Sequence, residues 1–397
     1  MGRVLCCWEL GAGYGHLYRL LPIAEALTQA GYQVTLVTRS IERARSTFTQ
    51  LEIEIFPAPS WLTPAKSFPL SLNYPQNLLR NGYWHALSLQ QRLIDWLSLF
   101  DTHQPDLILA EHAPTALLAA RIREIPRCVT GTGFTLPPRV TPIPGIQPWF
   151  PLPEHQLTQI ENNFLAIVNP LIKTLGGEEL ASVSGIFDQA EPFLCTLPEL
   201  DHYPMRDKAE YLGPILFTPN QQDTTWPEND GMRIFLYMNS ANRFLRPVLS
   251  ILKELPVSAL AFISALPEDE IQIWETDNLR IVLQPVNLSQ VVNECQLVIS
   301  QGGTNTGTFM LLNGIPLFIL PLELEQMLWA YRLSQQGLAA SVNYFSKQPD
   351  ILSKLQSILE SDALAQQAKN FSQRYANYAQ EQTIQHIVEK CSALSDT

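Results

Sequence analysis

The start of the chain carries the pattern that most constrains the fold. An apolar run, Val4–Trp8, is followed by a glycine-rich turn, Gly11–Gly15. Leu and Ala side chains then recur at helical spacing up to Gly31, and a second apolar run covers Val34–Val37. Strand, glycine turn, helix and strand in this order form a βαβ unit. Such a unit predicts an α/β fold with a doubly wound parallel sheet.

The same alternation of short apolar runs and helical stretches continues in both halves of the chain, so we expect a second α/β domain after the first. The further strands that we expect are Leu107–Ala110, Arg127–Thr130, Ile234–Tyr237, Ala259–Ile263, Arg280–Leu283, Leu297–Ser300 and Leu317–Leu320.

Proline, glycine and polar residues mark the segments between these elements. Residues 214–231 form the best interdomain linker. The segments Pro57–Asn81 and Pro137–Pro153 combine many prolines with Trp, Phe and Tyr, and they read as long loops. From Ala363 to Leu394 the chain is polar and lacks Gly and Pro, which predicts a terminal helix across the surface.

Composition excludes several classes of protein. Hydrophobic residues make up 46% and charged residues 16%, which excludes intrinsic disorder. The net charge of −12 disfavours nucleic-acid binding, although backbone amides can still bind one phosphate ligand. No apolar run is long enough for a transmembrane helix. The six cysteines contain no Cys-x-x-Cys pair, so we expect reduced, buried thiols and a cytoplasmic protein.

Two motifs place polar side chains at the ends of expected strands. Gly11, Gly13 and Gly15 precede His16 at the start of the first helix, and Glu111 follows the strand that begins at Leu107. Because ligands of open α/β sheets bind at the carboxyl ends of strands, Glu111 can approach His16. A carboxylate that holds one imidazole nitrogen leaves the other free as a general base. A capping histidine and an exposed loop carboxylate remain the alternatives.

The second half carries two comparable motifs. Ser300–Phe309 contains adjacent glycines and hydroxyls where a helix begins, which favours a diphosphate. Pro321–Gln326 offers a carboxylate and an amide that suit sugar hydroxyls. No metal-ligand cluster is apparent, which disfavours a metal-dependent site. A dinucleotide fingerprint would need Gly at position 16 and an acidic residue near Arg39, which disfavours an NAD site.

Together these motifs resemble the UDP-glycosyltransferase-like superfamily of GT-B glycosyltransferases. The family's Gly-His-x-x-Pro-x-x-x-Leu-Ala motif is similar to Gly15–Ala24. Its His-Gly-Gly block, which ends in Gly-Val-Pro, is similar to Gln301–Pro316, and its Pro-x-x-x-Asp-Gln motif is similar to Pro321–Gln326, with Glu325 for Asp. The resemblance implies two Rossmann-like domains that face a central cleft. It implies an acceptor-binding domain over 1–214, a linker over 215–230, a nucleotide-sugar-binding domain over 231–375 and a helix over 376–397 that packs back on the first domain.

The family's chemistry implies an inverting, metal-independent transfer of a hexosyl group. By this resemblance His16 is the general base and Glu111 takes the place of the Asp that orients it. The donor is expected to be a nucleoside-diphosphate sugar, with UDP-sugar first, and the acceptor a small, apolar hydroxyl compound. No other cofactor is implied, and a monomer or weak dimer is expected. The residues implied to bind the donor are Ser240, Gln301, Gly302, Gly303, Thr304, Asn305, Thr306, Glu325 and Gln326.

This sequence departs from the family on the donor side. Gln301 replaces a phosphate-binding His, and Phe309 replaces a Glu that binds the ribose diol. Leu283, two residues before Pro285, replaces an aromatic residue, and Trp329 stands where many members have Asn. A charge-assisted hydrogen bond contributes about 1.5–3 kcal/mol, so these losses weaken a donor site. The alternatives are a GT-B protein that has lost catalysis and binds a ligand or partner, and, less favoured, a GT-B epimerase or an NAD(P)-dependent enzyme.

Overall fold

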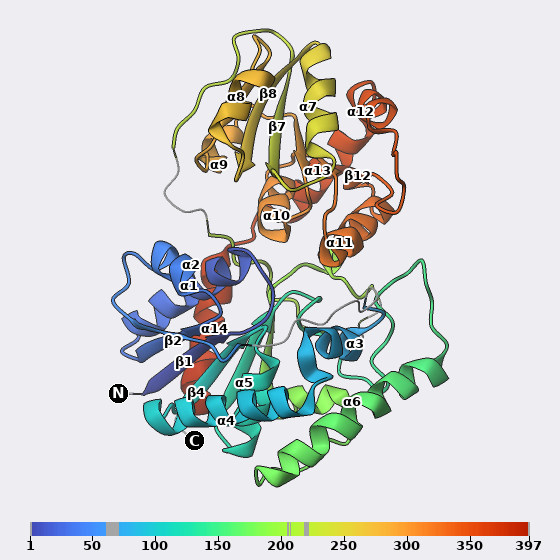
Figure 1. Ribbon diagram of the computed structural model, residues 1–397. Helices are drawn as coiled ribbons and strands as arrows, with labels where there is room; N and C mark the ends of the chain where they lie inside the picture. The colour runs from blue at the N-terminus through green and yellow to red at the C-terminus, as the bar shows by residue number, and fades with distance from the viewer. Residues whose placement is uncertain (1, 61–70, 205, 207, 218–221, 396–397) are drawn as a thin grey trace. The chain divides into compact units, whose positions relative to one another are not determined.

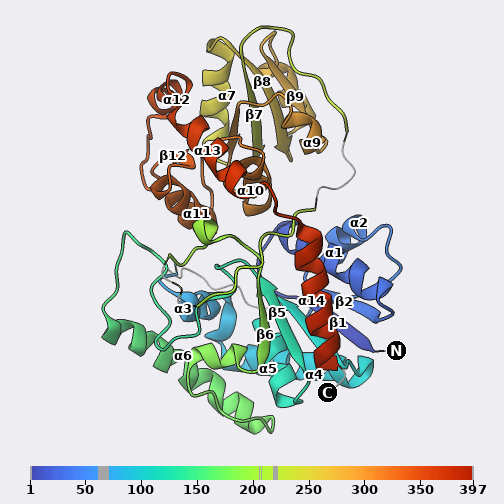
Figure 2. The ribbon, with the colours of Figure 1, turned by 180° about the vertical axis from the view of Figure 1, so that it is seen from behind.

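The computed structural model describes residues 2–60, 71–204, 206, 208–217 and 222–395. The chain forms two compact units. Unit 1 comprises Met1–Phe217 and Ala379–Thr397, and unit 2 comprises Thr218–Tyr378. Each unit contains a six-stranded sheet whose strands are all parallel, with helices on both faces (Figures 1 and 2). This confirms the predicted two-domain α/β class.

Unit 1 has the strand order β3-β2-β1-β4-β5-β6. Its strands, in that order, are Glu54–Pro57, Gln33–Thr38, Arg3–Trp8, Leu107–Glu111, Arg127–Gly131 and Ala190–Leu194. Its helices are α1 Gly15–Gln29, α2 Ile41–Thr47, α3 Tyr74–Leu78, η1 Leu79–Tyr83, α4 Ala86–His103, α5 Pro114–Ile122, α6 Glu154–Thr174, η2 Val183–Phe187, η3 Pro198–Leu200 and α14 Gln380–Ser395.

Unit 2 has the strand order β12-β11-β10-β7-β8-β9. Its strands, in that order, are Ala339–Ser341, Leu317–Ile319, Leu297–Ser300, Met232–Asn239, Val257–Ser264 and Leu279–Val282. Its helices are α7 Leu245–Glu254, α8 Glu268–Trp274, α9 Leu288–Val291, α10 Thr304–Leu312, α11 Leu324–Gln335, α12 Ile351–Leu359 and α13 Ala363–Arg374.

Burial on both faces explains why the strands read as continuous apolar runs. In β1, Leu5 and Cys7 join the core formed with α4, α5 and α6, whereas Val4, Cys6 and Trp8 join the core formed with α1 and α14. Successive side chains of a strand point to opposite faces, so one strand contributes to both cores.

The strand order marks the place in each unit where an open parallel sheet can bind a ligand. The order reverses between β1 and β4 in unit 1 and between β7 and β10 in unit 2. At such a switch point the connections leave the sheet in opposite directions, which opens a crevice at the carboxyl ends of the two strands. In unit 1 these ends are Trp8 and Glu111, which pair in register. In unit 2 they are Asn239 and Ser300.

The sequence missed several elements and was wrong about others. Strands β3, β6 and β12 were not expected; β6 carries Glu191 and Pro192, and β12 has 3 residues. Helices α3 and η1 lie within or across the end of the predicted loop Pro57–Asn81, because Asn73 caps α3 through its side chain. The expected long terminal helix is divided into α13 and α14. Residues 61–70 of that loop, with its Trp61 and Phe68, lie outside the described residues.

The linker and the last helix associate with different units. In the expected linker 215–230, the side chain of Trp226 is 8% exposed, and Ser258 of β8 donates a hydrogen bond to the Pro227 carbonyl. Residues 218–221 lie outside the described residues. Helix α14 packs against α1, and its Cys391 lies 3.8 Å from Cys128 of β5.

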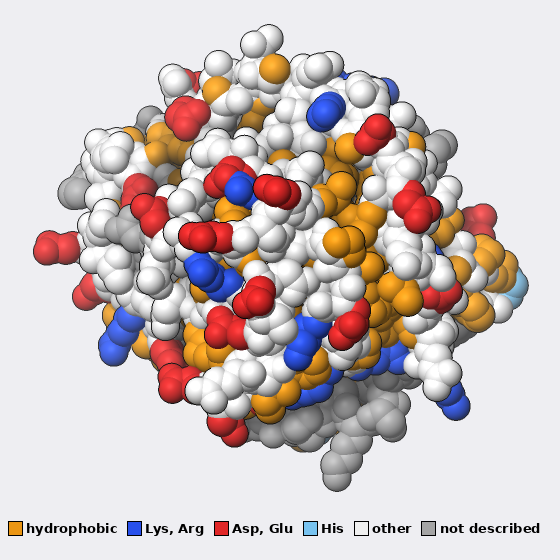
Figure 3. Space-filling view, turned by 90° about the horizontal axis from the view of Figure 1, so that it is seen from above, with side chains coloured by type: hydrophobic (Ala, Val, Ile, Leu, Met, Phe, Trp, Pro, Cys, Tyr) orange, Lys and Arg blue, Asp and Glu red, His pale blue; other side chains and the backbone are white. Residues whose placement is uncertain are grey.

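The described helices include none that is long and apolar enough to cross a bilayer. On the face shown in Figure 3, acidic and basic side chains are interspersed with hydrophobic ones, and the coloured residues form no continuous basic patch there.

Candidate functional site

His16 lies at the switch point of unit 1, in the first turn of α1. The turn that leads to it needs glycine, because Gly11 and Gly13 have φ values of 90° and 101°. The Trp8 ring stacks on the imidazole of His16, with the ring centroids 5.3 Å apart. The His16 side chain is 12% exposed, so it is largely buried but not closed off from solvent.

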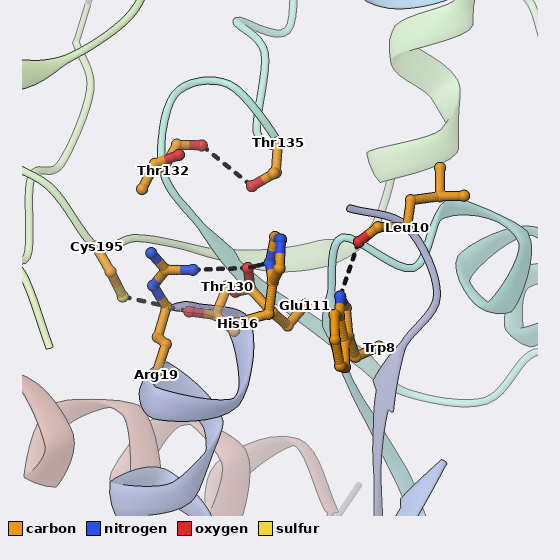
Figure 4. A network of polar contacts seen from close by, with 9 residues as sticks. All are labelled: Trp8, Leu10, His16, Arg19, Glu111, Thr130, Thr132, Thr135 and Cys195. Carbon is orange, nitrogen blue, oxygen red and sulfur yellow. Dashed lines mark hydrogen bonds and ion pairs between the residues drawn. The ribbon is translucent and has the colours of Figure 1, made fainter. Parts of the chain in front are cut away.

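Glu111 holds one nitrogen of this imidazole. The distance from His16 Nδ1 to Glu111 Oε1 is 2.8 Å, and the Glu111 side chain is fully buried (Figure 4). The structure thus brings together the two residues that the strand ends suggested. Because the carboxylate accepts from Nδ1–H, the lone pair of the neutral ring lies on Nε2.

The other nitrogen, Nε2, faces Gly11. A Cβ added to Gly11 would overlap Nε2, at a separation that real Cβ atoms do not show. A Cβ at Gly13 or Gly15 would meet nothing within 4 Å. Gly11 is therefore the glycine of this turn whose missing side chain leaves room for the His16 ring at Nε2.

Arg19 was not anticipated from the sequence. Its Nη1 lies 2.6 Å from the same Glu111 oxygen that His16 uses, and its side chain is 5% exposed (Figure 4). Residues three apart lie on the same face of a helix, so α1 presents both groups to β4. The sequence did contain a signal for it, because Arg19 is a charged residue between the apolar positions Leu17 and Leu20, which are buried in α1.

His112 is a second imidazole beside His16. Its ring centroid lies 5.7 Å from that of His16, and the residue has a φ of 46° and is 5% exposed. Burial lowers the pKa of His112 well below its usual value, and the nearby His16 lowers it further. His112 is consequently neutral near pH 7.

A buried ion pair fixes the start of the next helix. Arg92 Nη1 of α4 lies 3.1 Å from Glu9 Oε1, and both side chains are almost completely buried. Glu9 also accepts hydrogen bonds from the backbone N–H of Thr115, at 2.9 Å, and from its hydroxyl group. Burial raises the pKa of Glu9, while Arg92 and Thr115 act in the opposite direction. The pair anchors α5 directly after Glu111 and was also not anticipated.

The switch point of unit 2 is built mainly from the backbone. Helix α10 begins at Thr304, and its N-cap residue, Gly303, provides no side-chain cap. The first amides of a helix carry partial positive charge and suit an anion. The carbonyl oxygen of the Gln301 side chain accepts from Asn239 N–H at 3.1 Å, which links β10 to β7. Gly302, with a φ of 90°, packs against Ile319 of β11.

Other predicted donor residues lie nearby at strand ends of unit 2. Asn305 and Thr306 occupy the first turn of α10, and Asn305 Nδ2 is buried with no hydrogen-bond partner among the described residues. Ser240 follows β7 and donates to the Ala265 carbonyl at 2.7 Å. Glu325 and Gln326 open α11, after β11.

The side chains of Gln326 and Trp329 stabilise the fold of unit 2. The Gln326 side-chain oxygen accepts from the backbone N–H of Leu322 and Glu323, and it forms a capping box at the start of α11. Trp329 is buried in unit 2 and packs against Gly307 of α10, where a Cβ would overlap its ring. The Trp at this position thus belongs to the core of unit 2. Among the described residues, no group of three His, Cys, Asp or Glu side chains forms a metal site.

No protein-family model matches the chain, and no curated protein shows significant sequence similarity to it. Solved structures do match over nearly the whole chain. The spinosyn rhamnosyltransferase SpnG is 17% identical, with a TM-score of 0.64, over 97% of this chain and 100% of that one. The glycosyltransferase VinC, in complex with DTDP, is 16% identical, with a TM-score of 0.70, over 99% of each chain.

A third match is SsfS6, a glycosyltransferase of Streptomyces sp. SF2575. It is 19% identical, with a TM-score of 0.62, over 95% of this chain and 96% of that one. These likenesses agree with the two parallel sheets and their switch points. The chain therefore has the GT-B fold, which it shares with these solved structures.

Proposed function

We propose that this protein is an inverting glycosyltransferase, which moves a hexosyl group from a nucleoside-diphosphate sugar to the hydroxyl group of a small, apolar acceptor. The observation that carries the proposal is the His16–Glu111 pair. One nitrogen of the imidazole is held by a buried carboxylate, and the other lies beside Gly11, which has no side chain to cover it, in a ring that is 12% exposed. That is the arrangement a general base needs.

In the proposed reaction His16 Nε2 takes the proton of the acceptor hydroxyl. The acceptor oxygen forms a bond to the anomeric carbon while the bond from that carbon to the diphosphate oxygen breaks. Attack on the face opposite the leaving group inverts the configuration. Glu111 orients the ring and stabilises the imidazolium that forms.

Unit 2 would bind the departing diphosphate through neutral donors. The uncapped amides at the start of α10 offer partial positive charge, and the unpartnered Asn305 Nδ2 and the Gln301 side-chain amide add donors. This donor set supports a metal-independent mechanism, with Ser240 and Glu325 beside the donor. We propose a UDP-sugar as the donor. Thymidine diphosphate, which VinC and SpnG bind in their solved structures, is its first competitor.

Unit 1 would bind the acceptor. The loop Pro137–Pro153 leaves Val140 and Phe150 half exposed, with exposed fractions of 50% and 55%. Such side chains suit an apolar acceptor. SpnG has been solved in complex with spinosyn aglycone, which supports the proposal that the chain binds an acceptor of this general kind. The six cysteines are all free and buried, which supports a cytoplasmic protein. We further propose that it acts as a monomer or weak dimer.

A second candidate function is a GT-B protein that binds a ligand or partner without catalysis. One observation favours it: all 7 histidines of the chain lie in unit 1, so the proposed donor loop contains no imidazole. The two candidates differ in whether a nucleotide sugar is consumed.

The deciding experiment is a panel of UDP, dTDP, GDP and their sugars, tested for binding by thermal melting and for turnover. A ligand at ten times its dissociation constant stabilises a protein by about 1.4 kcal/mol, which raises Tm by roughly 2–4 °C. We expect such a shift with at least one nucleotide, and a product with inverted anomeric configuration by NMR. If no nucleotide at millimolar concentration moves Tm, the transferase proposal fails. Binding without turnover over a broad acceptor panel would support the second candidate.

A further inference from the structure

Two nitrogen donors converge on one oxygen of Glu111. His16 Nδ1 lies 2.8 Å and Arg19 Nη1 2.6 Å from Oε1 (Figure 4). The other oxygen, Oε2, is buried and has no hydrogen-bond partner among the described residues. The carboxylate is therefore bound on one side only, at the oxygen that the imidazole and the guanidinium share.

A buried carboxylate requires a compensating charge. Glu111 has no solvent exposure, and transferring an uncompensated carboxylate from water to such a position is strongly unfavourable. A neutral imidazole supplies a hydrogen bond but no positive charge. Arg19, whose side chain is also buried, supplies that charge at ion-pair distance.

We propose that Arg19 is a positioning residue for His16 and acts through Glu111. Arg19 holds the carboxylate in line with Nδ1 and neutralises part of its charge. The imidazole is then oriented by a hydrogen bond without facing a full negative charge, and loss of the Arg19 charge would favour the protonated ring. This inference rests on the proposed function, in which Nε2 accepts the acceptor proton.

The other charged or titratable groups near His16 are few among the described residues. His112, which follows β4, is neutral because burial lowers its pKa. Arg39, which follows β2, acts on His112 from the solvent side. Cys195, which follows β6, lies near Arg19 and Glu111, and burial raises the pKa of its thiol to about 11, so it carries no charge. Arg19 and Glu111 thus remain as the charged pair joined to the His16 ring, through the shared oxygen of Glu111.

Three variants separate charge from shape. R19M removes the charge and keeps an unbranched apolar side chain of comparable length. R19K retains the charge, and R19M/E111Q removes both charges, so that no buried charge is left unpaired. Two measurements report the protonation of the His16 ring. The first is the pH profile of kcat/KM, and the second is the pH at which the NMR signals of the ring are half shifted in the free protein.

In R19M we expect the acid limb of the kcat/KM profile and the NMR midpoint to move to higher pH by about one to two units. In R19K both remain within about 0.3 unit of the native protein. In the E111Q background, R19M moves the midpoint by less than about 0.3 unit, because Arg19 acts through the carboxylate.

The outcomes distinguish this inference from the proposed function. An unchanged pH profile and NMR midpoint in R19M would overturn the role of Arg19 while transfer still occurs. An equal shift of R19M in the native and E111Q backgrounds would also overturn it, because Arg19 would then act without Glu111. If no donor is consumed, the proposed function fails, and the NMR midpoints alone decide the role of Arg19. If R19M does not fold, R19Q takes its place as the uncharged variant: we expect the same shift of the pH profile and NMR midpoint, and an unchanged midpoint in R19Q would overturn the role of Arg19.

Discussion

The carboxyl ends of the two sheets differ in the chemical groups that they carry. In unit 1 the switch point holds buried charged and aromatic side chains, with His16, Glu111 and Arg19 joined at one oxygen. In unit 2 it holds glycines, helix amides and the neutral side chains of Gln301 and Asn305. On the proposed function, the same topology would support proton transfer through fixed side chains in unit 1 and anion binding through the backbone in unit 2. The first depends on a few residues, and the second on many weak donors.

The sharpest test of this comparison is His16→Ala. We expect kcat to fall about 10³-fold, because a general base contributes roughly 10²–10⁴-fold. The dissociation constant of the nucleotide, measured by calorimetry, should not change, since the proposed donor site lies in unit 2. The control is His155→Ala, at an exposed position of α6. Full activity of His16→Ala would remove His16 from the mechanism.

The buried pair Glu9–Arg92 has an exposed counterpart in unit 2, Arg246–Glu270, whose side chains are 51% and 23% exposed. Arg92→Met leaves Glu9 buried without its charge partner, which should lower the free energy of unfolding by about 3 kcal/mol or more. Arg246→Met should lower it by less than about 1 kcal/mol. Urea unfolding measures both. Equal losses would show that burial does not distinguish the two pairs.

Gly11 and Gly13 form a matched pair in one turn. Both have positive φ, so alanine strains the backbone at each, but only at Gly11 does the new Cβ overlap His16 Nε2. We expect Gly11→Ala to lower kcat about 100-fold, the size of effect that a displacement of about 1 Å produces. Gly13→Ala should retain kcat within about threefold. If the two variants lose activity equally, backbone strain rather than the space at Nε2 is responsible.

In unit 2, Gln301→His tests whether a charged donor improves a site made of neutral ones. A protonated imidazole near the diphosphate should tighten nucleotide binding about tenfold at pH 6, since charge-assisted hydrogen bonds contribute about 1.5–3 kcal/mol. The gain should shrink at pH 8, where the imidazole is neutral. Gln301→Asn is the control. A gain that is the same at both pH values would exclude the charge as its cause.

His112 gives unit 1 a dependence of stability on pH. Its pKa in the folded protein lies well below 6.5, so as pH falls the unfolded chain takes up the proton first. The stability that this histidine contributes is present above about pH 6.5 and is lost as pH falls below it, by up to about 1.4 kcal/mol per pH unit.

His112→Asn should remove this loss, because Asn tolerates the positive φ and does not titrate. Urea unfolding at pH 6.5 and 5.5 should show a smaller difference in stability for the variant than for the native protein. The exposed His155→Asn serves as control and should leave the difference unchanged. A native difference that persists in His112→Asn would assign the dependence to another group.

The sequence predicted what depends on strand ends and helical spacing, and it missed what depends on distant side-chain partners. His16 and Glu111 were expected to approach because parallel strands end at one edge of a sheet. Arg19 was missed because spacing alone shows which helix face a charge occupies, not which carboxylate it meets. The Glu9–Arg92 pair joins residues 83 positions apart, and no local pattern indicates it.

The path of the chain through the two units has a consequence for protein engineering. Unit 2 is one continuous stretch, Thr218–Tyr378, while unit 1 resumes at Ala379 and contributes α14. In the order of the sequence, unit 2 is therefore an insertion within unit 1. A chimaera that exchanges unit 2 for that of another GT-B protein needs two junctions and retains the last 19 residues of this chain, Ala379–Thr397. A chimaera with a single junction near residue 218 would replace α14 as well, and with it the cover over β5 and Cys128.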